Sequence, residues 1–345
     1  MATEPLRNSA GHAPPRPHGS ARRTSSIDTS WPEGRAGNMR LVGRARDIVT
    51  PRSGGAPISC AEDGFTAYLK SDRTIVAIDS DPARPALERL VGQRGGNHLR
   101  YVLDEVMPEE RRNATPLHLI LDDISGASLI AAWAWSQWNP GWLTEVRAAM
   151  TESELAKMMT DREGICTGFA PGSSALDPNL MNRSSTGGAP TTDLRHPEDP
   201  EGWHAFTVQE NVGMRRARRI DVTMGNVIEI DAAFQDSAST PDGSRRALHE
   251  YRLAVTADPV SFRILSIQAD PRVLPFAECP SATLNLRRLL GTPLSEMREK
   301  VIAELKGTAG CTHLNDALRA LAEAPALLGY LRHNEGGSAA ARRAG

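Results

Sequence analysis

Alternating apolar and polar positions predict strands in the second half of the chain. Residues 250–256 alternate, with Tyr251 and Leu253 on the same face, and such period-two alternation is typical of a half-buried strand. Other runs with strand character lie at residues 39–46, 219–221, 227–234 and 262–268. Because short polar turns separate the runs of the second half, we expect an antiparallel β-meander.

After the strands, apolar residues recur at helical spacing. Pro280 stands where the first turn of a helix favours proline, and the apolar stripe that follows it ends at Gly291. A second stripe begins near Leu294 and ends at Gly307, and a third begins at Leu314. Strands followed by helices predict an α+β fold with helices packed on one face of the sheet.

The two halves of the chain resemble each other in sequence. The matched runs keep one order: Ile27-Asp28 with Ile220-Asp221, Asp47 with Asp236, Asp81-Pro82 with Asp270-Pro271, and His118-Leu119 with His313-Leu314. An ordered set of matches predicts a duplication, in which residues 22–132 and 215–329 adopt the same fold. The alternative is chance similarity between two amphipathic domains.

The predicted organisation is two tandem related domains, each an antiparallel β-meander followed by about three helices. Its segments are a disordered tail (1–20), a cysteine-poor first repeat (21–134), a connector (135–212), a second repeat (213–332) and a second disordered tail (333–345). The connector combines a tryptophan cluster, a Gly- and Ser-rich loop and a predicted helix. Thr151 and Glu154 have the spacing of a capping box at the start of that helix.

Composition narrows the classes of partner. The chain has 345 residues, 40 Lys plus Arg against 42 Asp plus Glu, and a net charge of −2, so we expect neither nucleic acid nor an anionic membrane as a partner. No apolar run approaches the roughly 18 residues of a membrane span, and the polar N-terminal segment does not resemble a secretion signal. We therefore expect a cytoplasmic protein with reduced cysteines. The Ala-, Arg- and Gly-rich composition favours a bacterial source.

A glycine-rich turn and two cysteines mark the candidate site. Cys311 follows Gly310 and begins one predicted helix, and Cys279 begins another, and a helix N-terminus favours a thiolate. His313 adds a nitrogen, and cysteine and histidine are the ligands of zinc and iron–sulfur sites. The predicted metal ligands are Cys279, Cys311 and His313, with Cys166 or water as the fourth.

The first repeat lacks both cysteines, which favours a role in function over a role in the fold. Pro116 takes the place of Cys311, and Cys279 lies in a stretch without a counterpart. Two alternatives remain open beside metal or sulfur handling. One is a thiol-dependent enzyme that acts on an acyl or thioester substrate, with Cys311 or Cys279 as nucleophile and His313 as base. The other is a non-catalytic interaction module with buried thiols. The partner would be a small molecule or another protein.

Two charged runs are predicted at the surface. Asp122-Asp123 reads as a solvated turn, because adjacent residues of a helix do not face one reaction centre. Arg215, Arg216, Arg218 and Arg219 form a basic run that we interpret as an exposed surface at the entry of the second repeat.

The second half resembles a known family. Its matching runs are Arg219-Ile220-Asp221, Leu248-His249-Glu250-Tyr251-Arg252, Cys279-Pro280 and Gly310-Cys311-Thr312-His313-Leu314. They resemble the bacterial domain-of-unknown-function family DUF2889 over residues 215–330, and the first half looks like a degenerate second copy. The resemblance implies a domain and no activity. More loosely, the order of cysteines, strands and helices is similar to that of iron–sulfur scaffold domains.

Overall fold

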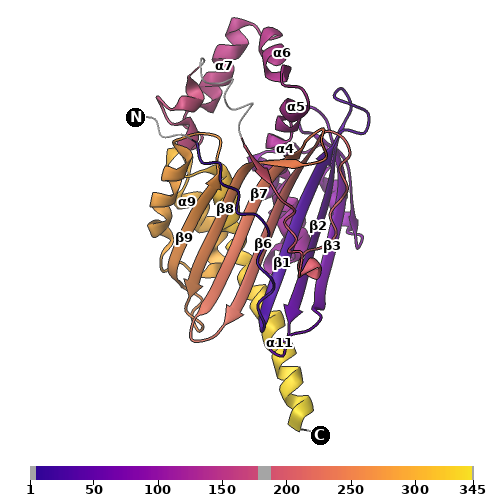
Figure 1. The fold of residues 1–345 in the computed structure, drawn as a ribbon, viewed down its shortest axis with the longest axis vertical. Coiled ribbons are helices and arrows are strands. Elements are labelled where there is room, and N and C mark those ends of the chain that lie inside the picture. Colours follow the sequence, from indigo (N-terminus) through magenta and orange to yellow (C-terminus); the bar gives the residue numbers. More distant parts are fainter. Residues whose placement is uncertain (1–4, 178–187, 344–345) are drawn as a thin grey trace.

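The computed structural model describes residues 5–177 and 188–343, with side chains as far as residue 334. The described strands form one nine-stranded antiparallel sheet in the order β4-β3-β2-β1-β6-β7-β8, and the outer edge of β8 pairs with both β5 and β9 (Figure 1). The strands are β1 (Ser20–Ser30), β2 (Met39–Thr50), β3 (Ile58–Leu69), β4 (Ile75–Asp81), β5 (Ala189–Thr191), β6 (Gly213–Met224), β7 (Ile228–Ser239), β8 (Arg245–Ala257) and β9 (Ile264–Val273).

Helices follow each set of four long strands and pack on one face of the sheet (Figure 1). The first half has η1 (Pro85–Leu90), α1 (Asn97–Val106), α2 (Pro108–Arg112), α3 (Pro116–Asp122) and α4 (Ile124–Ile130). The connector has α5 (Trp133–Trp138), α6 (Trp142–Ala148), α7 (Glu152–Arg162), η2 (Thr167–Phe169), η3 (Ser174–Leu176) and η4 (Pro200–Gly202). The second half has η5 (Cys279–Leu289), η6 (Leu294–Glu296), α9 (Met297–Glu304), η7 (Gly307–Ala309), α10 (Thr312–Arg319), η8 (Ala320–Glu323) and α11 (Ala324–Arg343).

The apolar positions of the alternating strand pattern face the helices. In β8, Tyr251, Leu253 and Val255 are buried among the helices of the second half. The first half has a separate apolar core around Phe65 and Leu103. The prediction of an α+β fold with antiparallel meanders is therefore confirmed.

The two halves meet at the centre of the sheet, where β1 pairs with β6 over eleven residues from Ser20↔Thr223 to Ser30↔Gly213. The sheet is thus continuous between segments that we predicted as two tandem domains, and the duplication stays a prediction. Matching ion pairs cross the junction in both directions. Arg22 donates to Asp221 at 2.5 and 2.8 Å, and Arg215 donates to Asp28 at 2.6 Å.

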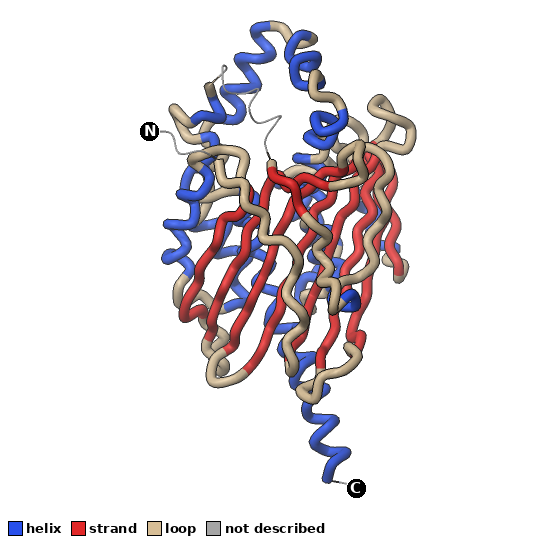
Figure 2. Tube along the Cα trace, viewed as in Figure 1, coloured by secondary structure: helices blue, strands red, loops and turns tan. Residues whose placement is uncertain are grey.

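Chain segments cover the face of the sheet opposite the helices (Figure 2). One is the N-terminal segment that we predicted as a disordered tail. The amide of Ala10 donates to Glu250 at 2.6 Å, and Arg16 forms an ion pair with Asp199 at 2.8 Å. The first bond ties the segment to β8 and the second ties it to the connector, so the described residues from 5 onward are packed in the structure. Composition suggested disorder because it does not reveal a partner far away in the chain.

The second predicted tail also differs from expectation. Residues 333–343 belong to α11, which contacts β1, β2 and β6 and projects beyond the sheet at its C-terminal end (Figure 1). Ten of the residues of the Gly- and Ser-rich loop, 178–187, lie outside the described residues. The helix predicted at Thr151 is present as α7, and its capping box with Glu154 is complete. Of the described helices, none combines the length and apolar character needed to cross a membrane.

Two tryptophans of the connector, Trp135 and Trp138, lie in α5 and touch both halves, and a third, Trp142, begins α6. Trp135 packs on Trp31 of the first half with ring centroids 5.4 Å apart. The indole nitrogen of Trp138 donates to the carbonyl of Ser239 in the second half at 2.9 Å. This helix therefore joins the two halves at one end of the sheet.

A buried histidine of the connector, His204, predicts a pH dependence of stability. His204 lies 2.9 Å from the hydroxyl of Thr24 and 2.7 Å from that of Ser26, and burial lowers its pKa from 6.5 to about 3. Between these pH values the unfolded chain holds one proton more than the folded chain, so acidification destabilises the fold by up to about 1.4 kcal/mol per pH unit. We expect urea unfolding at several pH values between 4 and 7 (roughly the window of this shift) to show a steeper fall for the wild type than for His204→Gln. Parallel curves for the two proteins would contradict this.

Candidate functional site

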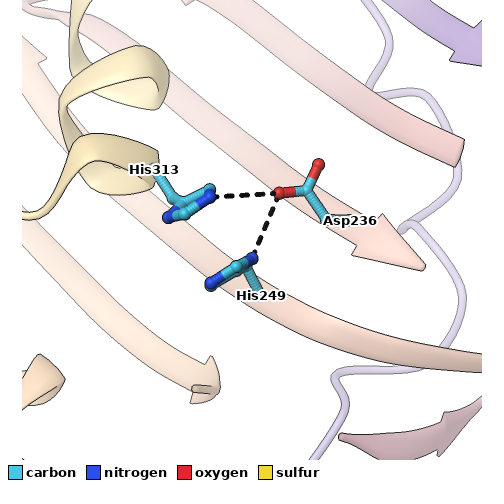
Figure 3. A group of neighbouring side chains, drawn as sticks. All are labelled: Asp236, His249 and His313. Atoms are coloured by element: carbon cyan, nitrogen blue, oxygen red, sulfur yellow. Dashed lines mark ion pairs between the residues drawn. The ribbon is translucent and has the colours of Figure 1, made fainter. Parts of the chain in front are cut away.

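Three potential ligands converge where β7, β8 and α10 meet (Figure 3). Asp236 on β7 lies directly opposite His249 on β8 in the strand register, so both side chains point to the same face of the sheet. His313 lies in the first turn of α10, above that face. Within the described part of the chain, this is the one group of three or more such residues whose ligand atoms all lie within 4.8 Å of one another.

The group is compact and shielded from solvent. Oδ2 of Asp236 lies 3.3 Å from Nδ1 of His249 and 3.8 Å from Nε2 of His313. The two imidazole rings stack with centroids 3.4 Å apart and planes 15° from parallel. The side chain of Asp236 is fully buried, and those of His249 and His313 are 7% and 13% exposed.

Charge states in this group favour ligand chemistry. Burial lowers the pKa of His249, and burial together with the charge of His249 lowers the pKa of His313 well below its usual value. Burial opposes ionisation of Asp236, but Arg216 and the two histidines lower its pKa to about 2. At neutral pH the group therefore consists of one carboxylate and two neutral imidazoles. Nδ1 of His249 is buried and makes no hydrogen bond of good geometry.

Arg216 on β6 fixes the carboxylate. Its Nε and Nη2 donate to Asp236 at 2.9 and 3.1 Å, and its Nη1 donates to Asp316 at 2.9 Å. The guanidinium also passes close to the backbone of α4. A Cβ on Gly126 would lie 1.8 Å from Nη1 of Arg216, so only glycine fits there.

A cavity of about 460 Å³ opens beside His313, between the helices of the two halves. His118 of α3 and His313 of α10, which align in the sequence, both border it. Arg216, Arg298 and Arg319 border it as well, at 1%, 9% and 6% side-chain exposure. The cavity therefore combines buried cationic groups with the edge of the Asp–His–His group.

The two charged runs predicted at the surface are in fact buried and pair with other charges, and one member of each run, Asp122 and Arg216, borders this cavity. Asp122 and Asp123 are 7% and 4% exposed. Asp123 accepts from Arg218 at 2.7 Å, and Asp122 accepts from Arg319 at 2.6 Å. Asp122 and Asp123 looked solvated because these arginine partners lie about a hundred or more residues away, and only the fold brings the opposite charges together.

None of the predicted thiol ligands belongs to the Asp–His–His group. Cys166, Cys279 and Cys311 are 8%, 4% and 3% exposed. A Cβ on Gly168 would lie 2.8 Å from Sγ of Cys279 and 3.8 Å from Sγ of Cys166, so these two sulfurs border the same glycine.

Cys311 joins this thiol cluster (Cys166, Cys279 and Cys311) from the start of α10. The hydroxyl of Tyr251 donates to its Sγ at 3.5 Å. The connector docks beside it, where the amide of Thr167 donates to the carbonyl of Gly310 at 2.8 Å. His313, two residues after Cys311, stacks on His249 (Figure 3).

Gly310, the residue before Cys311, is required by the close packing of the turn around it. A Cβ on Gly310 would lie 2.1 Å from the carbonyl oxygen of Leu305 and 2.8 Å from the side-chain nitrogen of Asn315. The turn itself therefore fills the space beside this glycine, which leaves no room there for a bound species.

The thiols are poor nucleophiles in this environment, although Cys311 and Cys279 begin helical segments as expected. Burial raises the pKa of Cys166 to about 11 and that of Cys279 well above its usual value. Burial also raises the pKa of Cys311. Loss of hydration outweighs the helix terminus here, because a buried thiolate loses its solvation.

This burial predicts the pattern of thiol labelling. Cys60 on β3 is the partly exposed cysteine, whereas the other three are buried. With an aromatic disulfide reagent at neutral pH, we expect one fast thiol in the native protein and the remaining thiols only after unfolding. Cys60→Ser should remove the fast phase. A fast thiol that persists in this variant would favour the nucleophile hypothesis instead.

Sequence reasoning missed two of the three members of the compact group. Asp236 entered as an aligned position and His249 as part of a family-like run, and neither was considered as a ligand. A weak signal was present, since Asp236 follows the predicted strand 227–234 by two residues and His249 directly precedes the predicted strand 250–256. A charged group next to a half-buried strand needs a partner if the strand extends to include it. The register that places them opposite each other is set by the β7–β8 pairing.

The fold and this site define an α+β protein with a buried Asp–His–His group beside a cavity. Residues 214–326 match the model of a family described as a protein of unknown function, DUF2889, as the resemblance implied. This range contains Asp236, His249 and His313 together with Cys279 and Cys311. No curated protein and no solved structure matches the chain.

Proposed function

We propose that this protein binds a divalent transition-metal ion, such as zinc or ferrous iron, through Asp236, His249 and His313. The observation that carries the proposal is the convergence of one carboxylate and two neutral imidazoles within 4.8 Å. Histidine and carboxylate ligands are typical of zinc and non-haem iron sites. The position of Nδ1 of His249 supports it further, because this buried nitrogen makes no hydrogen bond of good geometry and lies 3.3 Å from Oδ2 of Asp236, where one ion could contact both atoms.

The separations suit a metal ion. Ligand–metal bonds of about 2.0–2.2 Å place neighbouring ligand atoms about 3–4 Å apart, and the carboxylate oxygen lies 3.3 and 3.8 Å from the two ring nitrogens. Arg216 would act as the outer partner that orients the carboxylate, a role that outer-shell groups fill in many metal sites.

Three protein ligands would leave coordination positions open on the ion. Since His313 borders the cavity, these positions would face it, and an open position is typical of catalytic rather than structural zinc. A metal there would activate water or a bound substrate. We therefore favour a metal-dependent enzyme over an interaction module, and a cytoplasmic location, where a cluster of free thiols stays reduced.

Cobalt titration tests the site and its ligands together. We expect the purified, metal-stripped protein to bind one equivalent of Co²⁺ with weak visible bands and without the intense near-ultraviolet band of a cobalt thiolate. The triple variant Cys166→Ser, Cys279→Ser, Cys311→Ser should bind it equally. A thiolate band in the wild type, or loss of binding in the triple variant, would move the site to the cysteines, as first predicted. No binding by the wild type would end the proposal.

A further inference from the structure

The mouth of the cavity carries several large apolar side chains, beside the exposed ion pair of Arg111 and Glu299. Tyr101 on α1, Leu129 on α4, Ile165 after α7 and Ile302 on α9 all border it and are 66%, 54%, 47% and 47% exposed. Four separate elements thus place large apolar side chains around one opening. Such a grouping marks a binding surface, whereas scattered exposed apolar residues do not.

The deep part of the cavity is polar and rich in hydrogen-bond donors. Arg216, Arg298 and Arg319 border it and are at most 9% exposed. Nε of Arg319 and Nδ1 of His118 are buried and have no hydrogen-bond partner. A buried polar group without a partner is costly, so these atoms point to a ligand with polar atoms at its inner end.

The acidic groups of the deep part are already occupied. Asp122 accepts from Arg100, Arg298 and Arg319. Asp316 accepts from Arg216 at 2.9 Å and from Arg100 at 2.8 Å. The carboxylates that border the inner end are therefore saturated by arginine, which favours an acceptor over a cation as the ligand's inner group.

We propose that the cavity binds an amphiphilic organic acid, with its carboxylate at the inner end and its apolar body against the four residues of the mouth. The volume of about 460 Å³ suits a small-molecule ligand. The proposal rests on the proposed function in one respect: the metal ion would add positive charge beside the carboxylate. The apolar mouth stands independently of the metal.

Calorimetric titration of the metal-loaded protein with four probes tests this inference. Octanoate has both an apolar chain and an anionic head, whereas acetate has only the anionic head. Octanol has the same chain with a neutral head, and octylamine has the same chain with a cationic head. We expect octanoate to bind at least about tenfold more tightly than each of the other three, because only octanoate satisfies both ends of the cavity. Equal affinity for octylamine would overturn the proposal.

Variants of the mouth supply the structural test. Leu129→Ser with Ile302→Ser should weaken octanoate about tenfold by removing apolar contact area, and should leave cobalt binding unchanged. The matched control is Val260→Ser, since Val260 is 85% exposed and lies outside the cavity; it should change neither. An unchanged octanoate affinity in the double variant would refute the inference.

The metal proposal and the organic-acid proposal can be refuted independently of each other. A protein that binds octanoate with this selectivity but does not bind cobalt would refute the metal proposal and support the organic-acid ligand. A protein that binds cobalt but not octanoate would sink the ligand proposal alone.

Discussion

Replacing Arg216 by methionine is expected to lower the free energy of unfolding by about 3–5 kcal/mol, the usual loss when one partner of a buried ion pair is removed. Arg216 is 2% exposed and holds Asp236 and Asp316 with bonds of 2.9 to 3.1 Å. Asp316 keeps other arginine partners, but Asp236 would keep only the two histidines. A buried carboxylate without its arginine is the main source of the loss. Urea unfolding measures it.

A matched control separates this effect from general loss of charge. Lys157 forms an exposed i,i+4 pair with Asp161, and Lys157→Met should change the unfolding free energy by no more than about 0.5 kcal/mol. If Arg216→Met yields no folded protein, Arg216→Lys serves in its place, because lysine keeps the charge and loses the two-pronged bond. A loss below about 1 kcal/mol for Arg216→Met would show that the pair is not needed.

Replacing His249 by alanine is expected to weaken metal binding by more than about a hundredfold, the upper end of what loss of an outer-shell partner costs. His249 supplies one of three proposed ligands, and its side chain is 7% exposed, so solvent replaces it poorly. Replacing His313 should have a similar effect. Titration with Co²⁺, followed by its visible bands, gives the affinity of each variant.

The control is His118, the residue that aligns with His313 in the first half. Its side chain is 2% exposed and borders the same cavity, but its nearest acidic group is Asp104 at 3.4 Å, and the described structure places no second histidine against it. His118→Ala should therefore keep the affinity of the wild type within a few-fold. Equal losses for His118→Ala and His249→Ala would mean that the metal is not held by the Asp–His–His group.

Local sequence patterns were sufficient to predict the strands and helices. The alternation at Tyr251 and Leu253 and the helical stripes after Pro280 and Leu294 each depend on neighbours within a few residues. The capping box at Thr151 is likewise local, and it is present. These signals were sufficient for the α+β class, because the periods of strands and helices are properties of the backbone itself.

Long-range pairing decided how those elements assemble. The strands of both halves share one sheet because β1 and β6 pair at its centre, and no local pattern specifies which strand an edge will meet. The N-terminal segment read as disordered because its partners, such as Glu250, lie more than two hundred residues away. Its order comes from contacts and not from its own composition.

The candidate site likewise combines features that the sequence predicts with features that only the fold determines. The sequence by itself placed His313, Cys279 and Cys311 at helix starts and predicted a candidate site in the second half. Only the tertiary structure set His313 beside His249 and Asp236, because strand register and the packing of α10 fix those distances. The type of a residue determines which bonds its side chain can make. The fold determines which partners lie within bonding distance, because those partners come from distant parts of the chain.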